Sequence, residues 1–225
     1  IVQAACALFD SGLLQGKRVV ITAGPTREAL DPVRYISNNS SGKMGFALAQ
    51  ASVDAGAITT VVSGPVNLPT PRHVERRNIQ SATQMLDQCL ELVPNCDIFI
   101  SCAAVADYRP ASIEPHKIKK GGEQITLQLV RNPDIVATIA ATRPRPFTVG
   151  FAAETNDILT YAKGKMASKN LDMIIANDVS NQEIGFNSDD NEVTALWSGG
   201  EQTLPRAGKR VIANTLIAII ASKLG

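Results

Sequence analysis

The feature of this sequence that most constrains its fold is the alternation of short, continuously apolar segments with longer segments of helical period. The apolar segments are rich in β-branched residues, which is typical of strands that are buried on both faces. We expect strands at Lys17–Thr22, Ile58–Val62, Val74–Ile79, Asp97–Ala104, Phe147–Ala152 and Leu171–Ala176. Because amphipathic segments separate them, the pattern predicts a mostly parallel sheet covered by helices on both faces.

Helix-start and turn signals extend this prediction along the chain. Helices are expected to begin at Ser40 or Ser41, at Ser81, at Asn132-Pro133-Asp134 with Asn132 as the capping residue, at Asp157 and at Lys209. The segments Asn191–Trp197 and Gln202–Leu204 predict an antiparallel hairpin, Ile125–Val130 a half-exposed strand, and Val105–Gly122 a loop or flap. The expected fold class is α/β and Rossmann-like, with an added hairpin. Residues 17–225 are expected to form a single domain, and residues 1–16 the end of a linker.

Composition argues against several classes of partner. The formal net charge of +1 disfavours a nucleic-acid groove or an anionic membrane surface. The longest apolar run is too short to span a bilayer. Four cysteines without C-x-x-C spacing and only two histidines argue against a zinc site. Buried, reduced thiols are the simpler interpretation, and they predict a cytoplasmic protein.

Polar and turn residues gather directly after the expected strands. They are Gly24-Pro25-Thr26, Ser63-Gly64-Pro65, Ala103–Asp107, Gly150–Glu154 and Asn177-Asp178. Because the carboxyl ends of parallel strands form one edge of the sheet, we expect a ligand site there. Short loops also carry Gly, Pro and Asn for purely structural reasons.

The stretch from Arg34 to Gly45 places polar side chains and glycines immediately before a helical run. Such a loop can hold an anion, because the first N–H groups of a helix lack partners within it. Asn38 could donate its amide to a developing oxyanion or could simply occupy a left-handed turn. Arg34 could bind a carboxylate or phosphate, or form a surface salt bridge.

Lysines supply two further candidate groups. Lys117, Lys119 and Lys120 on the expected flap could close over a polyphosphate, although a solvated charge run is the simpler interpretation. Lys165 and Lys169 lie one helical turn apart, where like charges repel mildly unless an anion lies between them. A solvated helix face explains that pair equally well.

Familiar nucleotide-binding motifs are absent. The Walker pattern fails at Ser37 and Met44, and no G-x-G-x-x-G follows the first strand. Tyr161 and Lys165 fit the Tyr-x-x-x-Lys pattern of short-chain dehydrogenases, but without the glycine-rich turn. The acidic candidates for a metal or a base lack metal-site spacing; they are Asp107, Asp134, Glu154 and Asp178. Mg²⁺ brought by a nucleotide needs few protein ligands, so the metal site stays unknown.

A series of ordered segments carries a family resemblance from about Gly16 to the C-terminus. They are Ile21–Glu28, Asp31–Asn38, Ser40–Gly45, Ala103–Tyr108, Lys117–Lys120, Asn132–Val136, Gly150–Thr155 and Ala176–Asp178. Together they resemble bacterial phosphopantothenate–cysteine ligase, the synthetase half of a bifunctional coenzyme A biosynthesis protein.

The resemblance implies a two-step reaction with Mg²⁺ accompanying the nucleotide. The carboxylate of 4′-phosphopantothenate attacks the α-phosphate of CTP to give an acyl-cytidylate and pyrophosphate. The amine of L-cysteine then attacks the acyl carbon, which gives 4′-phosphopantothenoylcysteine and CMP. The resemblance also implies a homodimer and fusion to a flavin-dependent phosphopantothenoylcysteine decarboxylase half, of which residues 1–16 would be the linker end.

Site residues follow from the same resemblance. Lys117 corresponds to the lysine needed for adduct formation, Asn38 to the asparagine that handles the acyl-cytidylate, and Arg34 to the arginine four positions before it. CTP is implied to contact Ser101, Cys102, Ala103, Asp107, Lys117, Pro133, Asp134, Ile135, Val136, Phe151, Lys165 and Lys169. Two alternatives stay open: an NAD(P)-dependent reductase of the short-chain type, and a non-catalytic nucleotide-binding module.

Overall fold

The computed structural model describes residues 12–119, 121–154, 158–178 and 188–224. Its centre is an eight-stranded sheet with the order β12-β11-β10-β9-β6-β1-β4-β5. Six strands run parallel: β1 (Arg18–Ala23), β4 (Ile58–Ser63), β5 (Val74–Asn78), β6 (Ile98–Ser101), β9 (Phe147–Glu154) and β10 (Met173–Asp178). The hairpin β11 (Asp190–Trp197) and β12 (Gly200–Gly208) extends the sheet in antiparallel fashion. The predicted fold class is confirmed.

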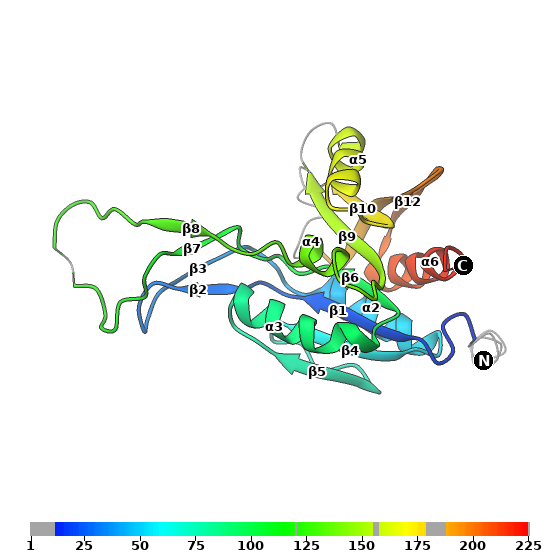
Figure 1. Ribbon diagram of the computed structural model, residues 1–225, viewed down its shortest axis with the longest axis horizontal. Coiled ribbons are helices and arrows are strands. Elements are labelled where there is room, and N and C mark those ends of the chain that lie inside the picture. The colour runs from blue at the N-terminus through cyan, green and yellow to red at the C-terminus, as the bar shows by residue number, and fades with distance from the viewer. Residues whose placement is uncertain (1–11, 120, 155–157, 179–187, 225) are drawn as a thin grey trace.

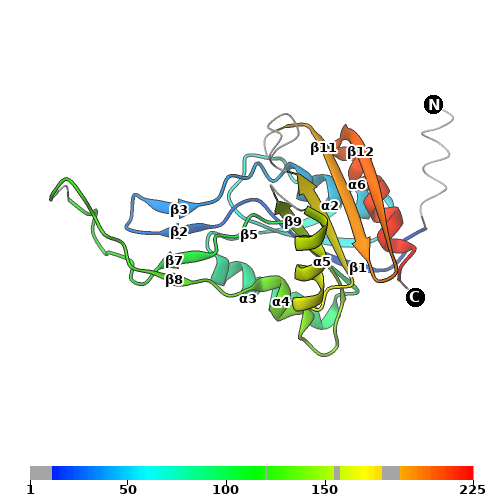
Figure 2. The same cartoon turned by 90° about the horizontal axis from the view of Figure 1, so that it is seen from above.

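Helices cover both faces of the sheet (Figure 2). One face carries α2 (Lys43–Asp54) and α6 (Lys209–Ala221), and the other carries α3 (Ala82–Leu92), α4 (Ile135–Ala140) and α5 (Ile158–Ser168), with the short 3-10 turn η1 (Val93–Asn95) after α3. Neighbouring residues of β1 face opposite cores: Ile21 packs with α2 and α6, whereas Val20 packs with α3. This burial on both faces explains why the strands read as continuous apolar runs.

Two antiparallel ribbons form an arm that projects from the body (Figure 1). One ribbon is β2 (Arg27–Ala29) with β3 (Tyr35–Ser37), and the other is β7 (Tyr108–Pro110) with β8 (Leu129–Arg131). The predicted loop at Val105–Gly122 therefore contains β7. The predicted strand Ile125–Val130 is wrong, since only its last two residues belong to β8, which pairs in the arm rather than in the main sheet.

Two predicted helix caps are also wrong. Gly42, rather than Ser40 or Ser41, caps α2, and it does so in a left-handed conformation without a side-chain cap. Asp134 caps α4 by accepting from the amide of Ala137. Asn132 instead donates its side-chain amide to the carbonyl of Ala106, so it ties α4 to the segment after β6.

Other helix predictions agree with the structure. Ser81 caps α3 in a capping box with Gln84, and α6 begins at Lys209. The predicted start at Asp157 lies outside the described residues, as do residues 1–11 of the expected linker. The described end of that linker packs on the body: Leu14 is fully buried, and its amide donates to the carbonyl of Ala55.

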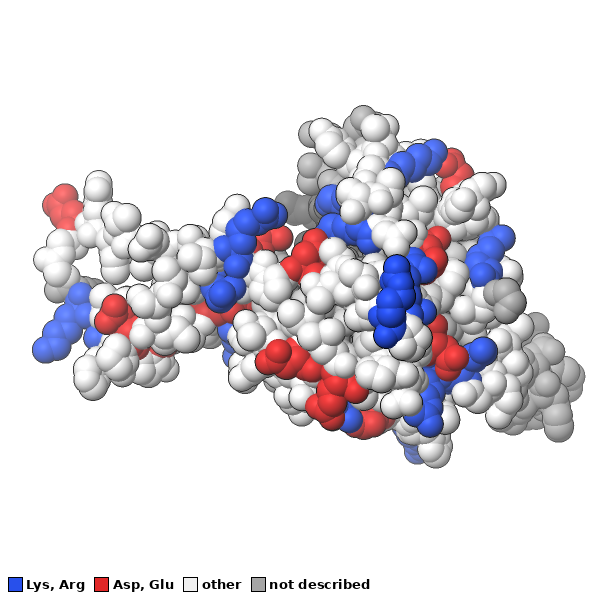
Figure 3. Space-filling view, viewed as in Figure 1, with Lys and Arg blue, Asp and Glu red and all other residues white. Residues whose placement is uncertain are grey.

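Acidic and basic side chains are interspersed on the face shown in Figure 3, and much of the arm is uncharged there. No helix within the described ranges is both long and apolar enough to cross a membrane.

Candidate active site

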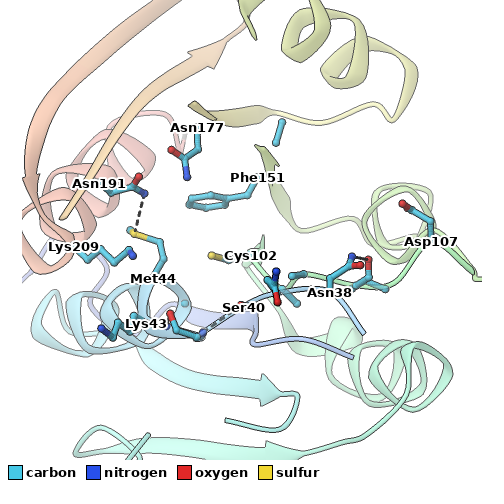
Figure 4. A pocket seen from close by; sticks show the side chains of 18 of the residues that line it. Asn38, Ser40, Lys43, Met44, Cys102, Asp107, Phe151, Asn177, Asn191 and Lys209 are labelled. Atoms are coloured by element: carbon cyan, nitrogen blue, oxygen red, sulfur yellow. Dashed lines mark hydrogen bonds between the residues drawn. The ribbon is translucent and has the colours of Figure 1, made fainter. Parts of the chain in front are cut away.

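A cavity of about 520 Å³ opens at the carboxyl edge of the parallel strands. Residues 38–45, which are the loop after β3 and the first residues of α2, form one wall, and the segment after β6 forms another. Phe151 of β9, Asn177 of β10 and Asn191 of β11 reach in from the neighbouring strands (Figure 4). The order of the parallel strands reverses between β1 and β6, and open α/β sheets bind ligands at such a crevice.

Glycine gives the first wall its shape. Gly42 has a φ of +74°, which a residue with a Cβ adopts only with strain. A Cβ on Gly45 would lie 2.6 Å from the Cβ of Ala23, so this glycine lets α2 pack closely on β1. The first residues of α2, Lys43 to Gly45, line the cavity, so the N-terminus of the helix and its partial positive charge face it.

Hydrogen bonds hold the second wall in place. Thr22 Oγ1 accepts from the amides of Cys102 and Ala103, at 3.2 Å in each case. Asn38 crosses between the two walls, because its Nδ2 donates to the carbonyl of Val105 at 2.9 Å. The loop after β3 and the loop after β6 are thus joined by the side chain for which a catalytic role is predicted.

Lys43 and Lys209 lie at the opposite end of the cavity from Asp107 (Figure 4). Lys43 pairs with Asp189 at 2.7 Å between Nζ and Oδ1, and Lys209 Nζ donates to the carbonyl of Ser188. Burial, together with the nearby charge of Lys43, lowers the pKa of Lys209. The amide of Asn191 contacts the sulfur of Met44 at 3.8 Å, which links β11 to α2.

Cys102 also lines the cavity, but burial raises the pKa of its thiol to about 12. The thiolate is the nucleophilic form of cysteine, so Cys102 is suited to packing against a ligand rather than to attack.

The structure brings many of the predicted site residues together. The predicted residues that line the cavity are Asn38, Cys102, Ala103, Asp107, Phe151 and Lys165. Tyr161, the partner that a short-chain dehydrogenase would need beside Lys165, is 57% exposed and is not part of the lining.

Other predicted nucleotide contacts lie beside the cavity. Ser101 is the last residue of β6, and Pro133, Asp134, Ile135 and Val136 form the start of α4. Lys169 pairs with Asp134 at 2.9 Å. Lys165 and Lys169 therefore have different surroundings, because only Lys165 lines the cavity.

Arg34 and Lys117 belong to the arm. Arg34 donates from Nε and Nη2 to Asp31 Oδ2 at 2.9 and 2.6 Å, and from Nη2 to the carbonyl of Ile118. Lys117 lines a separate cavity with Leu30 and Pro110. Neither side chain lines the cavity in the body of its own chain.

Sequence reasoning missed several residues that line the cavity, including Lys43, Met44, Asn191 and Lys209. Lys43 belongs to the polar stretch Arg34–Gly45, so its place in the sequence could have marked it as a candidate site residue. Lys209 and Asn191 follow more than 140 residues later, and no local pattern connects them with that stretch.

The structure offers limited means of holding a metal. Within the described ranges, no cluster of three or more His, Cys, Asp or Glu side chains could bind one. Asn177 lines the cavity, but its Oδ1 is buried away from solvent and has no hydrogen-bond partner in the part of the chain that is described. Mg²⁺ that arrives already coordinated by a nucleotide would need few ligands from the protein.

A polar cavity at the switch point of a doubly wound sheet defines an α/β protein that binds a small molecule. The family model of the DNA/pantothenate metabolism flavoprotein C-terminal domain matches residues 14–224, so this chain belongs to that family. The chain is similar to the coenzyme A biosynthesis bifunctional protein CoaBC of Vibrio vulnificus (strain CMCP6), with 55% identity over 220 residues that cover 96% of this chain and 55% of that protein.

Two further relatives agree with this assignment. CoaBC of Escherichia coli (strain K12) is 51% identical over 214 residues, which cover 93% of this chain and 53% of that protein. The chain thus spans about half the length of these relatives. The crystal structure of the C-terminal domain of a CoaBC protein superimposes with a TM-score of 0.82 and 40% identity, covering 95% of this chain and 98% of that one.

Proposed function

We propose that this chain catalyses the CTP-dependent ligation of 4′-phosphopantothenate to L-cysteine through an acyl-cytidylate. The observation that carries the proposal is the cavity at the carboxyl edge, where Asn38, Lys165 and the segment Cys102–Asp107 meet in a member of this family. The names of the relatives support a place in coenzyme A biosynthesis. The motif resemblance supports the choice of CTP and of the substrates.

The site suits the first half-reaction because it neutralises charge. A carboxylate that attacks the α-phosphorus of a nucleotide approaches an already anionic group, so nearby cations lower the barrier. Lys165 and the N-terminus of α2 supply positive charge inside the cavity. Mg²⁺ would add to this charge when bound.

The second half-reaction needs a donor that carries no charge of its own. When the cysteine amine attacks the acyl carbon, negative charge grows on the carbonyl oxygen and CMP leaves. The neutral amide of Asn38 can donate to that oxygen if it releases the carbonyl of Val105. In this proposal, backbone groups around Ala103 and the start of α4 contact the cytosine ring.

Lys117 and Arg34 enter the proposal through a second copy of the chain. The arm projects from the body, and the segment between β7 and β8 forms its far end (Figure 1). Exposed apolar side chains, among them Val33, Tyr35 and Ile113, lie on the arm or at its turns. We propose a homodimer in which these surfaces are covered and the arm of one chain reaches the cavity of the other.

Release of pyrophosphate from CTP, 4′-phosphopantothenate and L-cysteine, with the ligated product identified by mass, tests the proposal. CTP binding without pyrophosphate release would favour the nucleotide-binding module. Turnover that depends on NADPH instead would favour the short-chain reductase.

A further inference from the structure

The two lysines at the α2 end of the cavity are not among the residues that the family resemblance assigns to the nucleotide. Among the described residues, the lining includes Lys43, Lys165 and Lys209 and one carboxylate, that of Asp107. Figure 4 places Lys43 and Lys209 together beside Met44, with Asp107 at the far side. Two amines thus line the end of the cavity between α2 and α6, where the carboxylate of Asp189 pairs with Lys43, and Asp107 lies at the other end.

We infer that Lys43 and Lys209 bind the part of the nucleotide that leaves as pyrophosphate, and so hold the phosphate chain in line for attack. This inference rests on the proposed function. A nucleoside triphosphate carries about four negative charges, concentrated beyond the α-phosphate. That chain is repelled from the Asp107 end and attracted to the amines, which fixes the direction in which the nucleotide lies.

The surroundings of the two amines suit this role. Lys209 is only 8% exposed, so water screens its charge weakly and a phosphate would feel it strongly. Lys43 is paired with Asp189, whose side chain is 89% exposed. An ion pair with such an exposed carboxylate is weak, so a polyphosphate can compete for the amine. The N-terminus of α2, which begins at Lys43, adds its partial positive charge at the same place.

Binding of CMP, CDP and CTP to the full chain and its variants, measured by titration calorimetry, tests the inference. In Lys209→Met and Lys43→Met we expect CTP to bind at least about tenfold more weakly while CMP affinity changes less than about twofold, because only CTP presents the distal phosphates. Lys209→Arg should recover most of the CTP affinity. Lys223→Met is the matched control, since Lys223 lies over the ring of Trp197 and outside the cavity.

Equal weakening of CMP and CTP, or unchanged CTP affinity in both variants, would overturn the inference. Because Lys43 is partly exposed, Lys43→Met should fold even if Lys209→Met, at a buried position, does not. The affinities of Lys43→Met then test the inference alone. A parallel series with AMP, ADP and ATP separates this inference from the proposed function. If the wild-type chain prefers ATP, the proposed use of CTP is wrong, but a selective loss of ATP affinity in the variants would still support phosphate binding by the two lysines. If the wild-type chain binds neither triphosphate, both the proposed function and this inference are wrong.

Discussion

Asn38 shows how much of the proposed chemistry depends on one neutral side chain. Its amide joins the two walls of the cavity by donating to the carbonyl of Val105. The same donor could stabilise an oxyanion during attack on the acyl carbon, which a carboxylate at this position could not do.

For Asn38→Asp we therefore expect CTP consumption to continue while the acyl-cytidylate accumulates. Loss of one oxyanion donor should slow amide formation by about 10²–10³-fold. Quenched-flow analysis by mass spectrometry measures both species. Asn214→Asp, which places the same charge on the exposed side of α6, should behave as wild type. Formation of the final product at the normal rate in Asn38→Asp would remove the proposed role.

Lys117 carries the complementary prediction for the first half-reaction. Lys117→Gln should lose pyrophosphate release, because the charge that assists adduct formation is gone. Lys163→Gln, which removes a positive charge from the exposed side of α5 and outside the cavity, is the control and should release pyrophosphate normally. Normal pyrophosphate release by Lys117→Gln, measured with a coupled phosphate assay, would contradict the assignment.

At the scale of elements, Asp31 joins the two ribbons of the arm to each other. This buried carboxylate accepts hydrogen bonds from the amides of Val33, Arg34 and Ile118 and from the guanidinium of Arg34. Burial by itself would raise the pKa of Asp31, but these hydrogen bonds outweigh it and hold the pKa well below its usual range. Asp31 thus joins the turn between β2 and β3 to the segment that carries Lys117.

Asp31→Asn should loosen that junction without unfolding the body. The amide of Ile118 should exchange with solvent roughly tenfold faster or more, since a charge-assisted bond is lost. In the wild type the junction should persist above the ordinary carboxyl pKa of 3.8 and weaken only in stronger acid, because the folded-state pKa is lowered. Hydrogen exchange read by mass spectrometry measures both effects. Unchanged exchange at Ile118 in the variant would rule out this fastening.

Close packing between α2 and β1 makes a second prediction at this scale. Gly45→Ala would bring a methyl group within 2.6 Å of Ala23 Cβ, which forces α2 away from the sheet. We expect a loss of about 1–3 kcal/mol in the free energy of unfolding, read from denaturant titration. Gly164→Ala, with nothing within 4 Å of the added carbon on the exposed side of α5, should be neutral or slightly stabilising. A loss in Gly45→Ala no larger than in Gly164→Ala would contradict the packing argument.

At the scale of the whole molecule, the proposed homodimer predicts that the arm of one chain serves the cavity of the other. Mixing the inactive Asn38→Asp and Lys117→Gln chains tests this prediction. If the arm serves the cavity of a second chain, half of the dimers would be mixed and each would have one intact site, which restores about a quarter of wild-type activity. No recovery after exchange of subunits, confirmed by mass, would place both residues in the same chain's site.

The sequence alone predicted the sheet and its layers because those depend on local periodicity. The apolar runs around Ile21 and Phe99 could only be buried strands, and the turn residues after them could only gather at one edge. The same local patterns failed at Asn132, where Asp134 competes for the cap, and at Ile125–Val130, where an alternating pattern does not say which strand it will pair with.

The amino-acid sequence by itself thus determined the doubly wound sheet, the edge that holds the cavity and the family to which the chain is similar. Only the tertiary structure decided which side chains share that cavity. Lys209 and Asn191 line the same cavity as Lys43 and Met44 because the hairpin and α6 pack beside α2. Lys117 lies outside that cavity because the arm projects from the body. Contacts between residues so far apart in the chain depend on how whole elements pack, which no local pattern of residues encodes.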